Sequence, residues 1–376
     1  MKFFLLRVLS VLVLPGGAIA DSFTPLGYLP NGYDSTARGV SDDGSVVVGQ
    51  SNQRAFRWTS AGGMETIGGA YGSTALGVSA DGNVIVGSNP TSSGNDAFRW
   101  DSAAGIVSLG ILPGGTNFLS YAYGASGDGS VIAGRAVRNI YEATRWTSAT
   151  GTVGLGGLSG PPTGSEALAI SADGSVLVGT SNAPSGVESF RWTAATGMTS
   201  LGHLPGHLGF EVSRAWGISS DGSIIVGEAL NASNAAEAYR WTSQTGMVGL
   251  GFLPGGSSSV ARDVSADGSI VVGRAEGLDS YGNLAGLAFV WTPETGMKGL
   301  LELLVGRGVT GLDGWSLLEA TAVSADGRWV VGLGQNPQYL TEGFIVELTP
   351  IPVPPAAWLF GSALGVIGAT RRRLVG

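Results

Sequence analysis

Cysteine is absent from the 376-residue sequence, and histidine occurs only twice, at His203 and His207. The lack of cysteine excludes disulfides, zinc–thiolate sites, iron–sulfur clusters and thiol nucleophiles. The two histidines stand four residues apart, but Pro205 and Gly206 between them exclude a helix that would bring both onto one face. We therefore predict no metal site, no cofactor and no histidine-based catalytic site.

Charged residues are also scarce, at 13% of the chain, about half of the ~25% that is usual for globular proteins. Apolar residues make up 43%, which excludes a disordered chain. Glycine is abundant, with 64 residues, but it does not recur at every third position, and this excludes a collagen helix. The composition predicts a folded, turn-rich, all-β protein.

Residues 1–20 have the pattern of a secretory signal peptide. Two basic residues precede an almost wholly apolar stretch at residues 8–14, and a Pro-Gly-Gly turn follows it. Ala18 and Ala20 supply the small side chains of a cleavage site, so we predict cleavage by signal peptidase after Ala20. The alternative is a buried N-terminal strand.

Residues 350–376 have an equally biased composition. A proline motif is followed by an uncharged apolar stretch at residues 356–370 and then by an arginine run. As a helix this stretch would be ~22 Å long, short of the ~30 Å hydrocarbon core, so we predict a transient membrane span. The alternative is a buried C-terminal helix. The residues that define the motif are Pro352, Pro354, Trp358, Arg371, Arg372 and Arg373.

This tail resembles the PEP-CTERM sorting signal of exported bacterial proteins. Val353 stands between the two prolines where that signal usually has glutamate, as in its apolar variant, and three residues follow the arginine run. The resemblance implies export from a Gram-negative cell, transient insertion of the tail into the inner membrane, and its removal by an exosortase-type enzyme. It predicts a final location at the outer cell surface or in the extracellular matrix.

The part between the two ends, residues 21–349, is strongly acidic. It holds all 28 Asp and Glu residues but only 15 of the 20 basic residues, so its net charge is −13. A negative surface disfavours nucleic acid and anionic membranes as partners. We expect the mature protein to bind neither.

The middle of the chain repeats one unit seven times. Each copy contains a phrase such as SADGSVLVG, and most copies continue with a phrase such as AFRW and then LGxLPGG. The spacings between copies are 38, 47, 45, 48, 46 and 59 residues, and periods of this size indicate a repeat architecture. The aspartates that begin the turns are Asp43, Asp81, Asp128, Asp173, Asp221, Asp267 and Asp326.

Each copy reads as four short antiparallel strands. The Asp-Gly pair is expected to form the turn between the first two, because both residue types tolerate positive φ. Seven such units predict a seven-bladed β-propeller over residues 21–349. The last blade is expected to take three strands from residues 319–348 and its fourth from residues 22–30, which closes the ring. Residues 300–305 are predicted to form a short helix within the longest interval between copies, which is 59 residues. A β-solenoid is the alternative architecture.

The repeats resemble the extracellular HAF family of bacterial proteins. The similarity rests on the AFRW phrases, the LGxLPGG phrases and the GVSADG phrases, and covers nearly all of residues 24–348. The histidine for which that family is named is absent from every copy here. The resemblance implies a surface or secreted location and brings no catalytic residue with it.

Three sets of repeated side chains have a functional and a structural interpretation. The turn aspartates suit calcium or, with one carboxylate in most loops, a simple turn cap. Arginines of the third strand (Arg57, Arg99, Arg145, Arg191 and Arg240) suit an anionic ligand or a contact between blades. The repeated tryptophans suit the core, and Trp315 beside the insertion is the best candidate for an exposed aromatic side chain. We favour the structural interpretation of all three.

The sequence contains no catalytic constellation that we recognise. We therefore predict a non-enzymatic surface or matrix protein, a scaffold or binding module for a polysaccharide or another surface protein. The first alternative is an extracellular polysaccharide hydrolase or lyase that uses irregularly placed acids such as Glu211, Asp263, Glu276 and Asp279. A purely structural element of the envelope is the second.

Overall fold

The computed structural model describes residues 21–115, 118–160, 164–279 and 282–349. The predictions on the two ends lie outside the described residues. They concern the signal peptide with Ala18 and Ala20, and the sorting tail at residues 350–376. Within the described ranges the chain forms β-strands and one helix, α1 (Leu300–Gly306), at the position where the sequence predicts a helix. No helix in these ranges is long and apolar enough to span a bilayer.

The strands form antiparallel groups of four in which consecutive strands pair. Short parallel pairings, Phe118 with Gly94 and Glu211 with Gly186, join two pairs of these groups into larger sheets. The first groups in chain order are β2 (Ser35–Val40), β3 (Val47–Ser51), β4 (Arg54–Thr59) and β5 (Gly63–Thr66); β6 (Thr74–Val78), β7 (Ile85–Thr91), β8 (Gly94–Asp101) and β9 (Gly105–Ser108); and β10 (Phe118–Ala125), β11 (Val131–Val137), β12 (Tyr141–Thr147) and β13 (Gly151–Gly154). The next are β14 (Ser165–Ile170), β15 (Val176–Ala183), β16 (Gly186–Thr193) and β17 (Gly197–Ser200); β18 (Glu211–Ile218), β19 (Ile224–Leu230), β20 (Ala236–Thr242) and β21 (Gly246–Gly249); and β22 (Ser259–Val264), β23 (Val271–Leu278), β24 (Leu284–Thr292) and β25 (Gly296–Gly299).

The final group joins the two ends of the described chain. It consists of β26 (Ser316–Val323), β27 (Trp329–Gln335), β28 (Thr341–Glu347) and the first strand, β1 (Ser22–Pro25). β1 pairs antiparallel with β28, from Ser22 opposite Glu347 to Pro25 opposite Phe344. The phrase at residues 26–30 follows β1 as a turn, just as the LGxLPGG phrase follows the fourth strand of other groups.

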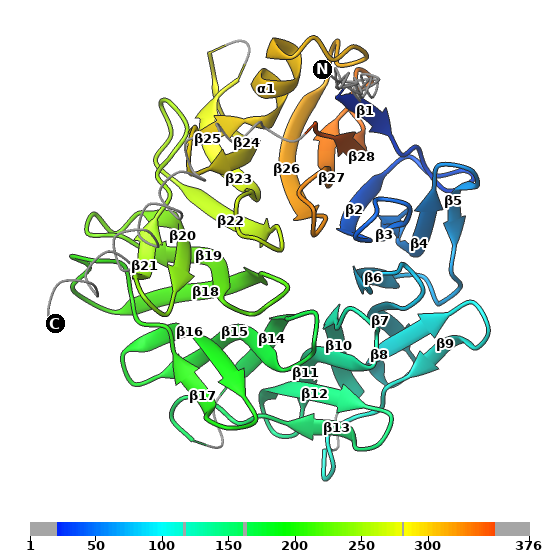
Figure 1. Cartoon of the computed structure of the whole chain (residues 1–376). Coiled ribbons are helices and arrows are strands. Elements are labelled where there is room, and N and C mark those ends of the chain that lie inside the picture. Colours follow the sequence, from blue (N-terminus) through cyan, green and yellow to red (C-terminus); the bar gives the residue numbers. More distant parts are fainter. Residues whose placement is uncertain (1–20, 116–117, 161–163, 280–281, 350–376) are drawn as a thin grey trace, which may run out of the picture.

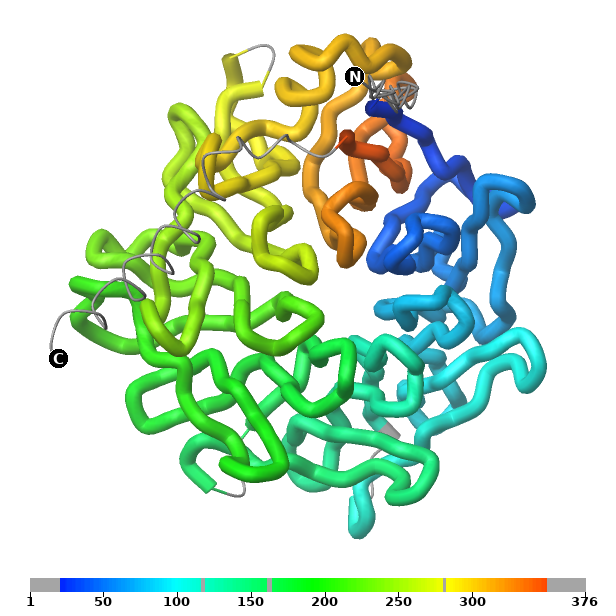
Figure 2. The backbone as a smooth tube through the Cα atoms, viewed as in Figure 1, coloured from blue at the N-terminus to red at the C-terminus, as the bar shows by residue number. Residues whose placement is uncertain are grey.

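The groups lie around a common centre. Figure 1 shows the first strand of each group nearest the centre and the fourth strand at the periphery. Figure 2 follows the chain once around, from blue at β1 to orange at β28, which lies beside β1. The side chains that face the middle of the molecule therefore come from the inner strands, which are β2, β6, β10, β14, β18, β22 and β26.

The Asp-Gly turn has the same hydrogen bonds in every group, and Asp221 is representative. Its Oδ1 accepts from the Ser219 hydroxyl at 2.7 Å and from the Ser223 amide at 2.9 Å. The fully buried Ser219 hydroxyl in turn accepts from the Ile224 amide at 3.0 Å. Within the pair only the glycine adopts positive φ, with φ of 72° at Gly222.

The turn glycines also form the contacts between neighbouring groups. A Cβ at Gly222 would lie 2.7 Å from Cγ2 of Val176 in the preceding group. At Gly44 the corresponding neighbour is the ring of Trp329, so the first repeat contacts the last in the same way as consecutive repeats contact each other. Close approach and positive φ together explain why the pair is Asp-Gly in every copy.

We expect Gly222→Ala to lower the free energy of unfolding by about 2 kcal/mol, because it adds a steric overlap to the cost of positive φ. Gly246→Ala is the matched control, since Gly246 has φ of 66° and a Cβ added there would meet nothing within 4 Å. The control is expected to cost about 1 kcal/mol. Denaturant unfolding of both variants measures the difference, and equal losses would contradict the packing argument.

The repeated tryptophans lie in the apolar clusters between neighbouring groups. Trp58 is buried within one such cluster. Trp100, Trp146 and Trp192 are partly buried, and each packs against a different cluster. Trp315 is also a core residue with 8% exposure, and its ring meets Phe23 edge-on at 5.0 Å. The structure thus supports the core interpretation of Trp315 over the exposed one.

Candidate functional site

A β-bulge occurs at the same position of each inner strand. The register shifts between an alanine and the residue two positions later, for example between Ala37 and Gly39 in β2 and between Ala215 and Gly217 in β18. A bulge adds one residue to one strand and redirects its side chain. The bulged residues are Arg38, Leu76, Tyr123, Leu168, Trp216, Arg262 and Thr321.

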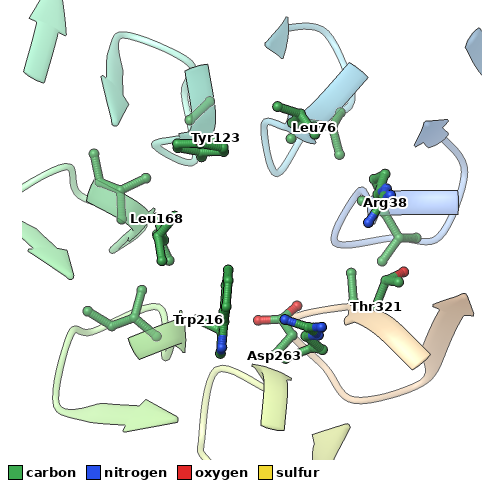
Figure 3. Close-up of a pocket in the computed structure, with 18 of the residues that line it drawn as sticks. Arg38, Leu76, Tyr123, Leu168, Trp216, Asp263 and Thr321 are labelled. Atoms are coloured by element: carbon green, nitrogen blue, oxygen red, sulfur yellow. The ribbon is translucent and has the colours of Figure 1, made fainter. Parts of the chain in front are cut away.

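All of these side chains line one central cavity of about 500 Å³. Figure 3 shows Arg38, Leu76, Tyr123, Leu168, Trp216 and Thr321 converging on it from different strands. This volume is in the range of small-molecule binding sites. The repeat thus presents one variable side chain per group to a shared space.

The charged side chains gather on one side of this cavity. Arg262 on β22 forms an ion pair with Glu319 on β26, and its guanidinium carbon lies 4.7 Å from the centre of the Trp216 ring. Arg38 on β2 makes no hydrogen bond or ion pair with any described residue. Burial lowers the pKa of Arg38, as does the nearby Arg262, while Glu319 opposes the shift. Arg38 is therefore a guanidinium available to an anion.

Asp263 is a carboxyl group in the cavity wall next to Arg262. Its Oδ1 accepts from its neighbour Val264 and its Oδ2 from the Val323 amide of β26, each at 2.9 Å. Burial raises the pKa of Asp263 to about 7, and the charge of Asp42 acts in the same direction, although the two amides oppose it. The group therefore titrates close to neutral pH.

The rest of the cavity lining is aromatic and aliphatic. It includes Tyr123, Leu76, Leu168 and the ring of Trp216, which lies next to the Arg262 guanidinium. The Tyr123 hydroxyl donates to Glu166 at 3.4 Å, and burial together with Glu166 raises the pKa of Tyr123. The cavity thus combines charged groups with aromatic and aliphatic surface, which suits a ring that also carries polar groups.

The other residues singled out in the sequence lie outside this cavity. The turn aspartates bond to their own loops, and no cluster of three or more metal-ligating side chains occurs in the described ranges. The third-strand arginines do not line the cavity; Arg57, for instance, pairs with Glu65 at 3.3 Å on the adjacent strand. His207 is buried, and its ring nitrogens face the carbonyls of Asn231 and Phe210.

Of the irregular acids proposed from the sequence, the structure brings only Asp263 into the cavity. Glu276 instead accepts from the hydroxyl and the amide of Ser257, at 2.6 and 2.9 Å. Sequence analysis missed Arg38, Tyr123, Arg262 and Glu319. All but Glu319 occupy one variable position of the repeated phrase, directly after an alanine, as in ARGVS, AYGAS and ARDVS.

No known protein-family model matches this chain, and no curated protein matches it in sequence. Solved structures do resemble it. An oligogalacturonate lyase from Vibrio parahaemolyticus matches with a TM-score of 0.58 and 11% identity, over 86% of this chain and 93% of the other.

Two TolB structures match less well, each with a TM-score of 0.43. The protein from Agrobacterium tumefaciens, described as a putative TolB, is 15% identical and covers 60% of this chain and 86% of its own. The TolB from Acinetobacter baumannii is 16% identical and covers 57% of this chain, which spans 53% of that protein. The likeness to the lyase structure, with the antiparallel groups around a central cavity, identifies a β-propeller-like fold.

Proposed function

We propose that the four-stranded groups are the blades of a closed, seven-bladed propeller. The seven Asp-Gly turns support the number. The pairing of β1 with β28 and the contact of Gly44 with Trp329 support closure, because both join the first and last repeats. In a closed ring the first and last repeats cover each other, and only the short outer strands keep a free edge, which suits a protein without disulfides.

We propose that the propeller is a non-enzymatic binding module for an acidic polysaccharide. The observation that carries this is Arg38, whose guanidinium has no hydrogen-bond or ion-pair partner among the described residues, in a cavity that is also lined by Trp216 and Tyr123. A sugar ring offers C–H groups on its faces, which suit Trp216, and an acid group on the ring suits Arg38. Arg262 and Asp263 then offer hydrogen bonds to hydroxyl groups.

We propose that this module acts outside the cell. The support is the signal-peptide pattern of residues 1–20, the sorting-signal pattern of residues 350–376 and the resemblance to extracellular repeats. Signal peptidase and an exosortase-type enzyme would then be partners during export. Residues 21–349 would be the mature protein at the cell surface or in the matrix.

The test is to incubate the purified protein with exopolysaccharide from the producing cells and to measure binding and newly released sugar ends together. Binding without release is the expected result. Release of ends would overturn the non-enzymatic proposal, and the absence of both would favour a protein partner or a structural role.

One observation favours a second candidate, a polysaccharide lyase or hydrolase. A carboxyl group with a pKa of about 7 in the wall of the central cavity has the properties of a general base near neutral pH. If ends are released, Asp263→Asn should abolish the release and weaken binding far less, because the amide of the variant can still hydrogen-bond to hydroxyl groups and Arg38 is unchanged. Persisting release in that variant would exclude Asp263 as the base.

A further inference from the structure

A second cavity, separate from the central one, lies at the periphery beside α1. It has a volume of about 600 Å³ and is lined mainly by apolar side chains of β23, β24, β26, α1 and the turn before β22. We call it the α1 groove. Its exposed rim includes Leu278 and Val305, which are 51% and 59% exposed, and its floor includes Leu253 and Leu317, which are buried. Exposed apolar side chains around a cavity indicate an interaction site, where another segment or molecule covers them.

The described chain ends beside this groove. The carboxylate of Asp21 accepts from the Thr349 amide and hydroxyl, each at 2.6 Å, and pairs with Arg307 at 2.8 Å. Arg307 caps the C-terminal end of α1, and its guanidinium also donates to the Thr349 carbonyl at 3.5 Å. Residues after Thr349 therefore start at the end of the helix that forms one side of the α1 groove (Figure 1).

The segment that starts there has the right chemistry and length. After the prolines it contains the consecutive apolar residues Trp358, Leu359 and Phe360. Eight residues separate Thr349 from Trp358, and extended they span up to about 26 Å, whereas α1, with seven residues, is only about 10 Å long. The linker is thus longer than the helix that forms one side of the groove, and the segment carries no charge that would need solvation there.

We propose that residues 358–360 of the same chain dock in the α1 groove and shield the apolar tail from water while it is attached. The intramolecular link favours this occupant over a second copy, because a short tether gives a high effective concentration. This inference does not depend on which ligand the central cavity binds. It assigns the groove to the tail of the unprocessed chain.

The test uses full-length protein with a single cysteine, since the native chain has none to interfere. Val305→Cys reports on the groove, and Asp313→Cys is the control, because Asp313 is exposed in the same insertion and does not line the groove. The maleimide labelling rate of each is measured with the native tail and with a tail carrying Trp358→Ser, Leu359→Ser and Phe360→Ser.

We expect the native tail to slow labelling at Val305→Cys at least tenfold relative to the serine tail, and to leave labelling at Asp313→Cys unchanged. Equal rates at Val305→Cys with the two tails would overturn the proposal. Protection that increases with protein concentration would also overturn it, because it would assign the groove to a second copy. So would protection that arises only with phosphatidylglycerol vesicles, which would assign the groove to lipid.

Discussion

Arg38→Gln is expected to weaken binding of an acidic polysaccharide by roughly 10- to 100-fold, while the stability of the fold stays the same or rises slightly. The loss follows from the ~1.5–3 kcal/mol of a hydrogen bond to a charged group, at tenfold per 1.4 kcal/mol. Stability is spared because Arg38 has no hydrogen-bonding partner among the described residues and lies near a second guanidinium, Arg262. Calorimetric titration and thermal unfolding of the same preparation measure the two effects.

The control for this variant is Arg57→Gln. It removes the same charge from a position that pairs with Glu65 outside the cavity. A general electrostatic attraction would be weakened equally by both variants, whereas a site in the cavity is weakened by Arg38→Gln alone. If the two variants bind alike, the central cavity is not the binding site.

Asp263→Asn is expected to make the free energy of unfolding less sensitive to rising pH. The folded state holds the pKa of Asp263 at about 7, above its ordinary value of 3.8. Between these values the folded protein binds more protons than the unfolded chain, so stability is highest at low pH and falls as pH rises through 7. At about 1.4 kcal/mol for each pKa unit, the full loss is roughly 4 kcal/mol.

The variant lacks this titration. Its amide also replaces one oxygen that accepts a backbone hydrogen bond, which costs about 1 kcal/mol at every pH. The difference in unfolding free energy between variant and native protein should therefore shift in favour of the variant by roughly 3 kcal/mol between pH 5 and pH 8. Denaturant unfolding at the two values measures the shift.

Asp313→Asn is the matched control, because Asp313 is exposed in the insertion and does not line the central cavity. The difference in unfolding free energy between Asp313→Asn and the native protein should change little between pH 5 and pH 8. A pH-independent difference for Asp263→Asn would show that the carboxyl is already ionised in the folded protein at pH 5. That result would also remove the argument for Asp263 as a base.

The local structure was largely predictable from the repeats. The Asp-Gly turns, the β-branched second strands and the short helix at residues 300–306 are all encoded within a few residues of the chain. Turn chemistry and strand alternation are local properties, and seven copies made the signal unambiguous. The structure adds that the aspartate side chain caps the turn and that only the glycine of each pair takes the left-handed conformation.

The candidate site was not predictable in the same way. Arg38, Trp216, Arg262 and Glu319 each belong to a different repeat, and repetition directed attention to the letters that recur, such as the third-strand arginine. The variable residue lines the cavity because it lies at a bulge in a strand near the centre of the molecule. Neither the bulge nor the central position can be recognised from the sequence of one repeat. The same holds for Asp263, whose pKa depends on burial and on Asp42 from another repeat.

The sequence by itself therefore determined the repeat, the class of secondary structure and the local turns, because each depends on neighbouring residues. It also predicts export from the patterns at residues 1–20 and 350–376. Only the tertiary structure decided which side chain of each repeat faces the centre, that Arg38 has no described hydrogen-bonding or ion-pair partner there, and that the chain reaches its last described residue beside the α1 groove. The physical reason is that side-chain burial, the electric field of charges in other repeats, and contacts between remote segments arise only when the strands are assembled around a common centre.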